Sequence, residues 1–138
     1  LATATASALS EHHGRDVPFA FNRKEIKDHG EGGQLVGSKL NGRIVIIDDV
    51  ITAGTSVKEA VQIIEAAGAE PVSLTIALDR EEKINGDGHS AAQIIREQLG
   101  IQIYPIAKFS ELIEYIRTIP ALSSNVALLE SYRDRYGA

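Results

Sequence analysis

Two adjacent carboxylates followed by small and hydroxyl-bearing residues form the segment with the clearest chemistry. An apolar run, Ile44-Val45-Ile46-Ile47, leads into Asp48-Asp49-Val50-Ile51-Thr52-Ala53-Gly54-Thr55-Ser56. The free N–H groups of a helix start attract phosphate, and a glycine lets backbone amides come close to it. Two acids would repel a phosphate alone. They suit a ligand that also bears hydroxyl groups, or one that binds a divalent metal, because such a metal prefers oxygen ligands. The order of residues therefore predicts a sugar-phosphate site in loop 48–56.

Plainer interpretations of this segment exist. An isolated Asp-Asp pair is usually a solvated strand end, and Thr52–Ser56 could merely cap a helix. The complete order of buried strand, two acids and Thr-Ala-Gly-Thr-Ser favours the binding site instead. Neither G-x-x-x-x-G-K-[ST] nor G-x-G-x-x-G between a strand and a helix is present, which argues against a P-loop NTPase and a dinucleotide enzyme.

A second segment, the loop expected over residues 22–37, combines cations with glycines. Its basic residues and histidine are Arg23, Lys24, Lys27 and His29. Its glycines include Gly30, Gly32 and Gly33. A mobile loop that carries cations can close over a pyrophosphate leaving group, exclude water and reopen. Three acids within the loop offset the fixed cations, so composition alone favours an ordinary solvated loop.

The two segments together resemble a known family. Ile44–Ser56 looks like the signature of the type I phosphoribosyltransferases, and Phe21–Gly33 is similar to the lid of the bacterial orotate phosphoribosyltransferases. The similarity continues through Leu35-Val36-Gly37, Ala77–Arg80 and, more loosely, Tyr132–Gly137. It therefore covers essentially the whole chain. The implied fold is α/β: a parallel sheet flanked by helices, forming one core domain over residues 1–138.

The resemblance implies a role for each matching residue. Asp48 and Asp49 would hold the ribose hydroxyls of phosphoribosyl pyrophosphate (PRPP), and the loop after them would cradle its 5-phosphate. The residues implied to bind PRPP are Arg23, Lys24, Lys27, His29, Asp48, Asp49, Val50, Ile51, Thr52, Ala53, Gly54, Thr55 and Ser56. Lys24, Asp48 and Asp49 would be catalytic, and Mg²⁺ would bind mainly through PRPP rather than through a protein ligand set. Thr52 and Arg80 would contact orotate.

The implied reaction transfers a phosphoribosyl group from PRPP to N1 of orotate. The products would be orotidine 5′-monophosphate and diphosphate, in pyrimidine nucleotide synthesis. The family's lid reaches into the partner subunit's site, which implies a homodimer. Transfer to another base is an alternative, against which the lid sequence argues. A non-catalytic regulator that senses PRPP is another alternative. The absence of a basic face or a DNA-binding module argues against it.

For Arg80, composition alone favours an exposed arginine in a polar turn.

Composition bounds the remaining functional classes. The net charge of −5 argues against a nucleic-acid partner, and no apolar run reaches the roughly 18 residues that a membrane helix needs. The chain has no cysteine, which fits a reducing compartment, and we expect the cytoplasm. The four histidines show no metal-ligand spacing. The chain opens at Leu1 without a basic signal region and contains no methionine, so we expect a processed product or a fragment that lacks the family's N-terminal hood.

Alternating strands and helices must position these segments. The predicted strands are Val17–Phe21, Arg43–Asp48, Val72–Leu78 and Ile101–Pro105. The predicted helices are Ala2–His12, Ser56–Ala67, Ser90–Leu99, Phe109–Thr118 and Ser124–Tyr136. The unbroken β-branched run in Arg43–Asp48 suggests a strand buried on both faces, as in a parallel sheet. The helix Ser56–Ala67 has one apolar face, formed by Val57, Ala60, Val61 and Ile64. Ser90 with Gln93 predicts a capping box at the start of the next helix. On the last helix, the residues expected on the inner side are Val126, Leu129, Tyr132 and Tyr136.

Overall fold

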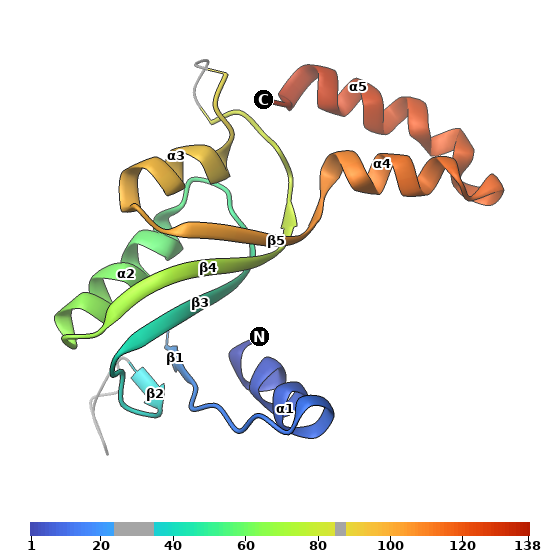
Figure 1. Cartoon of the computed structure of the whole chain (residues 1–138). Helices are drawn as coiled ribbons and strands as arrows, with labels where there is room; N and C mark the ends of the chain where they lie inside the picture. Colours follow the sequence, from blue (N-terminus) through green and yellow to red (C-terminus); the bar gives the residue numbers. More distant parts are fainter. Residues whose placement is uncertain (24–34, 85–87) are drawn as a thin grey trace.

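The computed structural model describes residues 1–23, 35–84 and 88–138 (Figure 1). The strands in chain order are β1 (Ala20–Asn22), β2 (Leu35–Gly37), β3 (Arg43–Val50), β4 (Glu70–Asp79) and β5 (Gln102–Lys108). The helices are α1 (Ala2–His13), α2 (Thr55–Ala66), α3 (Ala91–Leu99), α4 (Phe109–Arg117), the 3₁₀ helix η1 (Pro120–Asn125) and α5 (Val126–Tyr136). No helix among these residues is long and apolar enough to cross a membrane.

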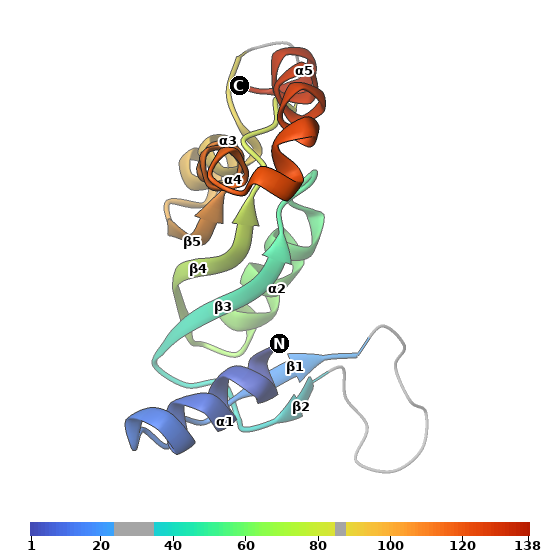
Figure 2. The same cartoon turned by 90° about the vertical axis from the view of Figure 1, so that its right-hand side faces the viewer.

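A parallel sheet with the order β3-β4-β5 forms the centre of the molecule, as the sequence predicted. Its register places Leu74 of β4 between Ile46 of β3 and Ile103 of β5. The helices α2 and α3 lie together on one face of this sheet (Figures 1 and 2). Since all three strands run in the same direction, their carboxyl ends meet at one edge, where open α/β sheets bind ligands.

The core lies between the sheet and these two helices. The predicted apolar face of α2 is confirmed, because Val57, Val61 and Ile64 are buried. Leu74 and Ile76 of β4 are almost completely inaccessible to solvent. Burying an aliphatic side chain of this size contributes about 1.5–3 kcal/mol. This layer fixes β3 and α2, and therefore the loop between them.

The prediction that β3 is buried on both faces is wrong. The side chain of Val45 is 52% exposed, and Tyr104 and Ile106 of β5 are also exposed. Within the described residues, helices cover the α2/α3 face of the sheet, and side chains that alternate to the opposite face remain in contact with solvent. A β-branched run thus indicated a strand correctly but not how many of its faces are covered.

The segment around residues 17–37 also differs from expectation. The strand lies at β1 rather than at Val17–Phe21, and β2, expected to be part of a loop, pairs antiparallel with it. Three residue pairs join the two strands, with Ala20 opposite Gly37. Gly37 has φ +114°, and a Cβ there would lie 3.0 Å from the Cα of Ala20. Strands of three residues are too short to produce a recognisable alternation of apolar and polar positions.

The C-terminal helices pack at the carboxyl end of the sheet (Figure 2). Pro120 begins η1, so α5 begins at Val126 rather than at the predicted Ser124. Its expected inner side is only partly confirmed: Val126 and Leu129 are half-buried, whereas Tyr132 and Tyr136 remain 37% and 42% exposed. The reason is polar contact. The Tyr132 ring lies 5.6 Å from that of Phe109, but its hydroxyl points to charged groups described below.

Candidate phosphoribosyl site

Loop 48–56, at the carboxyl edge of the sheet, comprises the last residues of β3, the connection 51–54 and the first residues of α2. The strand runs to Val50 rather than to the predicted Asp48, and the helix begins at Thr55 rather than at the predicted Ser56. The loop encloses a small hollow of about 50 Å³. The hollow is lined by Asp48, Val50, Ile51, Thr52, Gly54, Thr55, Ser56 and Val57. The structure therefore brings most of the predicted sugar-phosphate residues around one space. Ile51 is buried in the core, so it offers only its backbone to a ligand, whereas Thr52, Thr55 and Ser56 expose their hydroxyl side chains.

Gly54 gives the loop its shape. It caps α2 with φ +74°, in the left-handed region that favours glycine. A Cβ at this position would also lie 2.9 Å from Cγ1 of Ile95, which is fully buried in α3. No side chain of residues 1–23, 35–84 or 88–138 caps the first turn of α2, and that turn contains no acidic residue. The amides at this helix start are consequently available to an anion, and the helix dipole favours one there.

The two acids differ in exposure. Asp48 is half-buried at the end of β3, and Asp49 is exposed. Oδ1 of Asp48 accepts the N–H of Asp49 at 2.9 Å, and Oδ1 of Asp49 accepts the N–H of Val50 at 2.7 Å. Each carboxylate is thus oriented by the backbone of the next residue through one oxygen, and its Oδ2 forms no hydrogen bond within the described part of the chain. Two such oxygens suit hydroxyl donors on a sugar.

The cationic segment is only partly described. Lys24, Lys27 and His29 lie outside the described residues, while Arg23 is half-buried just after β1. The β1–β2 hairpin, from which the expected loop extends, lies towards the start of β3 in both views, whereas loop 48–56 lies beyond its end (Figures 1 and 2). The structure therefore places the β1–β2 hairpin, which Arg23 follows in sequence after β1, away from loop 48–56 of the same chain.

Arg80 follows β4 directly, at the edge of the sheet that carries loop 48–56. Val50 pairs with Leu78, so Thr52 and Arg80 each lie two residues beyond a paired position. The guanidinium is not a free cation. Its Nε and Nη2 donate to Oε1 of Glu82 at 2.8 and 2.5 Å, and Nη2 also lies 3.3 Å from the Tyr132 hydroxyl. The hydrogen bond to Glu82, followed by that to Tyr132, raises the pKa of Arg80 above its ordinary value.

Sequence reasoning missed two residues at this point. Glu82 lies in the polar turn expected around Arg80, without a role of its own, and Tyr132 is expected only on the inner side of the last helix. Both contact Arg80, and the Tyr132 hydroxyl donates to the same Oε1 of Glu82. The one available signal was the C-terminal Tyr-Arg-x-x-Tyr-Gly sequence at Tyr132–Gly137, which carried part of the family resemblance.

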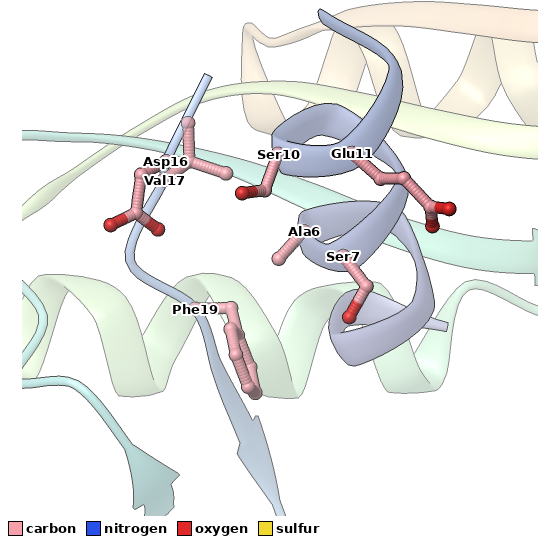
Figure 3. A pocket seen from close by; sticks show the side chains of 7 residues that line it. All are labelled: Ala6, Ser7, Ser10, Glu11, Asp16, Val17 and Phe19. Atoms are coloured by element: carbon pink, nitrogen blue, oxygen red, sulfur yellow. The ribbon is translucent and has the colours of Figure 1, made fainter. Parts of the chain in front are cut away.

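A wider hollow of about 380 Å³ lies elsewhere, between α1 and the segment that leads into β1 (Figure 3). Its lining residues are Ala6, Ser7, Ser10, Glu11, Asp16, Val17 and Phe19. In Figure 3 the side chain of Ser10 points towards this segment, while Glu11 points away from it. This hollow contains two acids and no basic residue, so it does not suit a phosphate.

Comparisons with known proteins agree with the geometry. Residues 1–104 match the family described as "Phosphoribosyl transferase domain". The chain is 55% identical over 137 residues to the orotate phosphoribosyltransferase of Thioalkalivibrio sulfidiphilus (strain HL-EbGR7) and 50% identical over 137 residues to that of Cronobacter sakazakii (strain ATCC BAA-894). Each alignment covers 99% of this chain and 64% of the relative. The chain thus spans just under two thirds of the length of these relatives.

Solved structures give the same picture. The orotate phosphoribosyltransferase of Francisella tularensis matches with a TM-score of 0.78 and 27% identity, covering 99% of this chain and 64% of that chain. This match confirms the predicted fold class, a parallel sheet flanked by helices. The matched family model includes β3, loop 48–56, α2 and β4, the elements that build the site. The chain belongs to the phosphoribosyl transferase domain family.

Proposed function

We propose that this protein transfers the phosphoribosyl group of PRPP to N1 of orotate, giving orotidine 5′-monophosphate and diphosphate for pyrimidine nucleotide synthesis. The observation that carries the proposal is the placement of Arg80 at the sheet edge of loop 48–56: the hollow of that loop and an oriented guanidinium lie at one sheet edge. A guanidinium suits a base that bears a carboxylate, because its charged N–H groups form strong hydrogen bonds with carboxylate oxygens. The 55% identity to a relative named orotate phosphoribosyltransferase supports the same base.

The residues of the loop have distinct roles in this proposal. The amides of residues 52–56 and the hydroxyls of Thr52, Thr55 and Ser56 hold the 5-phosphate. Asp48 and Asp49 accept hydrogen bonds from the two ribose hydroxyls. As the bond from ribose to pyrophosphate loosens, positive charge builds on the ribose ring, and these carboxylates hold the ring and stabilise that charge. Orotate N1 then forms the new bond at the anomeric carbon as pyrophosphate departs, and the proton of N1 is released to the pyrophosphate or to water.

Mg²⁺ is the proposed cofactor. No group of three or more His, Asp or Glu residues that could hold a metal exists among residues 1–23, 35–84 and 88–138. The donors that are present are the carboxylates of Asp48 and Asp49, each with one oxygen that is not hydrogen-bonded to described residues. Such a small donor set fits an ion that keeps water and takes most of its ligands from the substrate. Mg²⁺ bound in that way supplies positive charge to the leaving pyrophosphate.

The lid and the assembly complete the proposal. Arg23, Lys24, Lys27 and His29 neutralise the pyrophosphate, with Lys24 acting mainly in the transition state, and the lid serves the site of a second chain in a homodimer. Supporting this, the β1–β2 hairpin lies away from loop 48–56 of its own chain. Residues 1–138 act as one phosphoribosyltransferase core, and the absence of cysteine fits a cytoplasmic enzyme.

Pyrophosphate release tests this function. The natural full-length protein should release pyrophosphate from PRPP when orotate is added. Orotate should be preferred by about 10²-fold or more in kcat/KM over uracil, because a site built for a charged group rejects an analogue that lacks it. Hypoxanthine and adenine serve as further bases. A preference for one of these bases would replace the proposed substrate, and PRPP binding without turnover on any base would indicate a sensor instead of an enzyme.

A further inference from the structure

The most connected polar cluster in the described part of the chain is centred on Glu82. Its Oε1 accepts hydrogen bonds from Arg80 Nε, Arg80 Nη2 and the Tyr132 hydroxyl. The carboxylate of Glu82 and the guanidinium of Arg80 retain only 19% and 34% of their side-chain accessibility. Partial burial strengthens such charge-assisted bonds relative to bonds in water. Arg80 is therefore held along one edge, that of Nε and Nη2, while Nη1 forms no hydrogen bond within the described residues.

The backbone beside Arg80 is held in an unfavourable conformation. Glu81 has φ +52°, the one positive value among the described non-glycine residues. A side chain in this region costs about 1 kcal/mol, and such strain persists only where the surroundings enforce it. Here the Glu81 N–H donates to Asp79 Oδ1 at 2.9 Å, and Glu81 Oε2 accepts the N–H of Ser110 at 2.8 Å. The turn that aims Arg80 is thus fixed from β4 and from the start of α4.

The C-terminal residues join the same turn. Glu82 and Gly137 form an antiparallel bridge. The Lys83 N–H donates to the carbonyl of Tyr136 at 2.9 Å, and the Ala138 N–H donates to the carbonyl of Glu81 at 2.8 Å. The Tyr132 ring packs between those of Phe109 and Tyr136, with centroids 5.6 and 4.8 Å away. A segment some fifty residues distant in sequence therefore forms one wall of the Arg80 turn.

We propose that Glu82 and Tyr132 are positioning residues for the base site: they hold Arg80 by its Nε–Nη2 edge and leave its Nη1 edge to the carboxylate of the base. This inference rests on the proposed function and adds to it, since it assigns base selection to the C-terminal helix as well as to β4. An arginine held in one orientation loses less side-chain freedom on binding than a free one, and this improves affinity for its ligand. Neither residue needs to touch the substrates.

The test compares three variants of the natural full-length protein. Tyr132→Phe removes the one hydroxyl that bridges Arg80 and Glu82, and Glu82→Gln keeps the shape but removes the charge. Tyr136→Phe is the matched control, because it removes from the same helix a hydroxyl that forms no hydrogen bond with Arg80 or Glu82 in the described structure. We expect the KM for orotate to rise about 3- to 10-fold in Tyr132→Phe and about 10- to 30-fold in Glu82→Gln. The KM for PRPP should stay within about twofold in both variants, and both constants should be unchanged in the control.

Two further measurements separate positioning from general destabilisation. In an Arg80→Ala background, Tyr132→Phe should have no additional effect on the KM for orotate, because its partner is gone. Separately, the Arg80 Nε–H signal in nitrogen-15 NMR, identified by its loss in Arg80→Ala, should exchange with water at least about tenfold faster in Glu82→Gln than in the control. This second readout does not depend on turnover, so it holds even if orotate proves not to be the substrate.

Each contrary result has a defined meaning. Absence of orotate-dependent pyrophosphate release in the wild type would overturn the proposed function alone. Equal increases of both KM values in Tyr132→Phe, an additive effect in the Arg80→Ala background, or unchanged Arg80 Nε–H exchange in Glu82→Gln would each overturn the positioning roles and leave the proposed function intact.

Discussion

Loop 48–56 and the Arg80 turn lie at the same edge of one sheet but are built in opposite ways. The loop takes its shape from consecutive residues: a strand end, two acids bonded to the next amides, a glycine and a helix start. The Arg80 turn takes its shape from Ser110 and Tyr132, which lie 29 to 52 residues away from their partners in the turn. The proposed phosphate site is thus local in sequence, whereas the proposed base site depends on the packed C-terminal helices. Changes in the two regions should therefore have different consequences.

Removing the acids of the loop should have the largest effect. In the natural full-length protein, Asp48→Asn with Asp49→Asn should lower kcat by at least about 10³-fold with every base tested, because charge stabilisation on the ribose is lost. A pair of acids on α2, changed as Glu59→Gln with Glu65→Gln, serves as the control and should retain activity. Wild-type turnover in the variant that carries both Asp48→Asn and Asp49→Asn, measured by pyrophosphate release, would rule out the ribose role.

The same inactive chains can test whether the lid acts across a dimer. Mixed with Lys24→Gln chains, they should regain partial activity, because a hybrid dimer contains one site with intact acids and an intact lid from its partner. The hybrids are identified by a size tag on one chain and by native mass spectrometry. A sample shown to contain hybrids but lacking any regained activity would exclude a lid that acts in trans.

A smaller effect, confined to one of the two substrates, is expected from a change in the Arg80 turn. Arg80→Ala should raise the KM for orotate by about 10- to 100-fold, since a hydrogen bond to a charged group is worth about 1.5–3 kcal/mol. The KM for PRPP should change little. Steady-state kinetics with each substrate varied in turn give both constants. If the two constants rose together, Arg80 would be a structural residue, and the contrast between the two regions would disappear.

The smallest effect is expected from substitutions that test whether the shape of loop 48–56 depends on packing against α3. Gly54→Ala should destabilise the fold by about 1–3 kcal/mol, because of its positive φ and the crowding against Ile95. Ile95→Val should cost about 0.5–1.5 kcal/mol alone but less in the Gly54→Ala background, where the lost methyl makes room. Chemical denaturation of the four proteins gives the coupling energy. Strict additivity would show that α3 does not support the loop.

The contrast explains what could be predicted from the sequence. The apolar face of α2 and the capping box of Ser90 with Gln93 were predicted correctly, because both depend on residues three or four positions apart. The carboxyl-edge location of loop 48–56 followed from the same local order. The roles of Glu82 and Tyr132 could not be predicted, since nothing near either residue indicates which of them will meet after α4 and α5 fold.

Two further errors have the same origin. The β1–β2 hairpin was missed because only three residue pairs define it, fewer than periodicity can detect. The exposure of Val45 was missed because the covering of a sheet face depends on where helices pack, and a β-branched run carries no such information. The proposed roles of the site residues derive from family resemblance; the structure adds which of them lie together.

The long sequence separation in the Arg80 turn has a consequence for how the protein is made. The Tyr132 hydroxyl contacts a carboxylate 50 residues earlier in the chain. A ribosome adds roughly 5–20 residues per second, so Glu82 exists for roughly 3–10 s before Tyr132 is synthesised, and longer before both leave the exit tunnel. Loop 48–56 needs no such delay once β4 and α3 have emerged. We therefore expect the growing chain to form loop 48–56 first and to fix the orientation of Arg80 last.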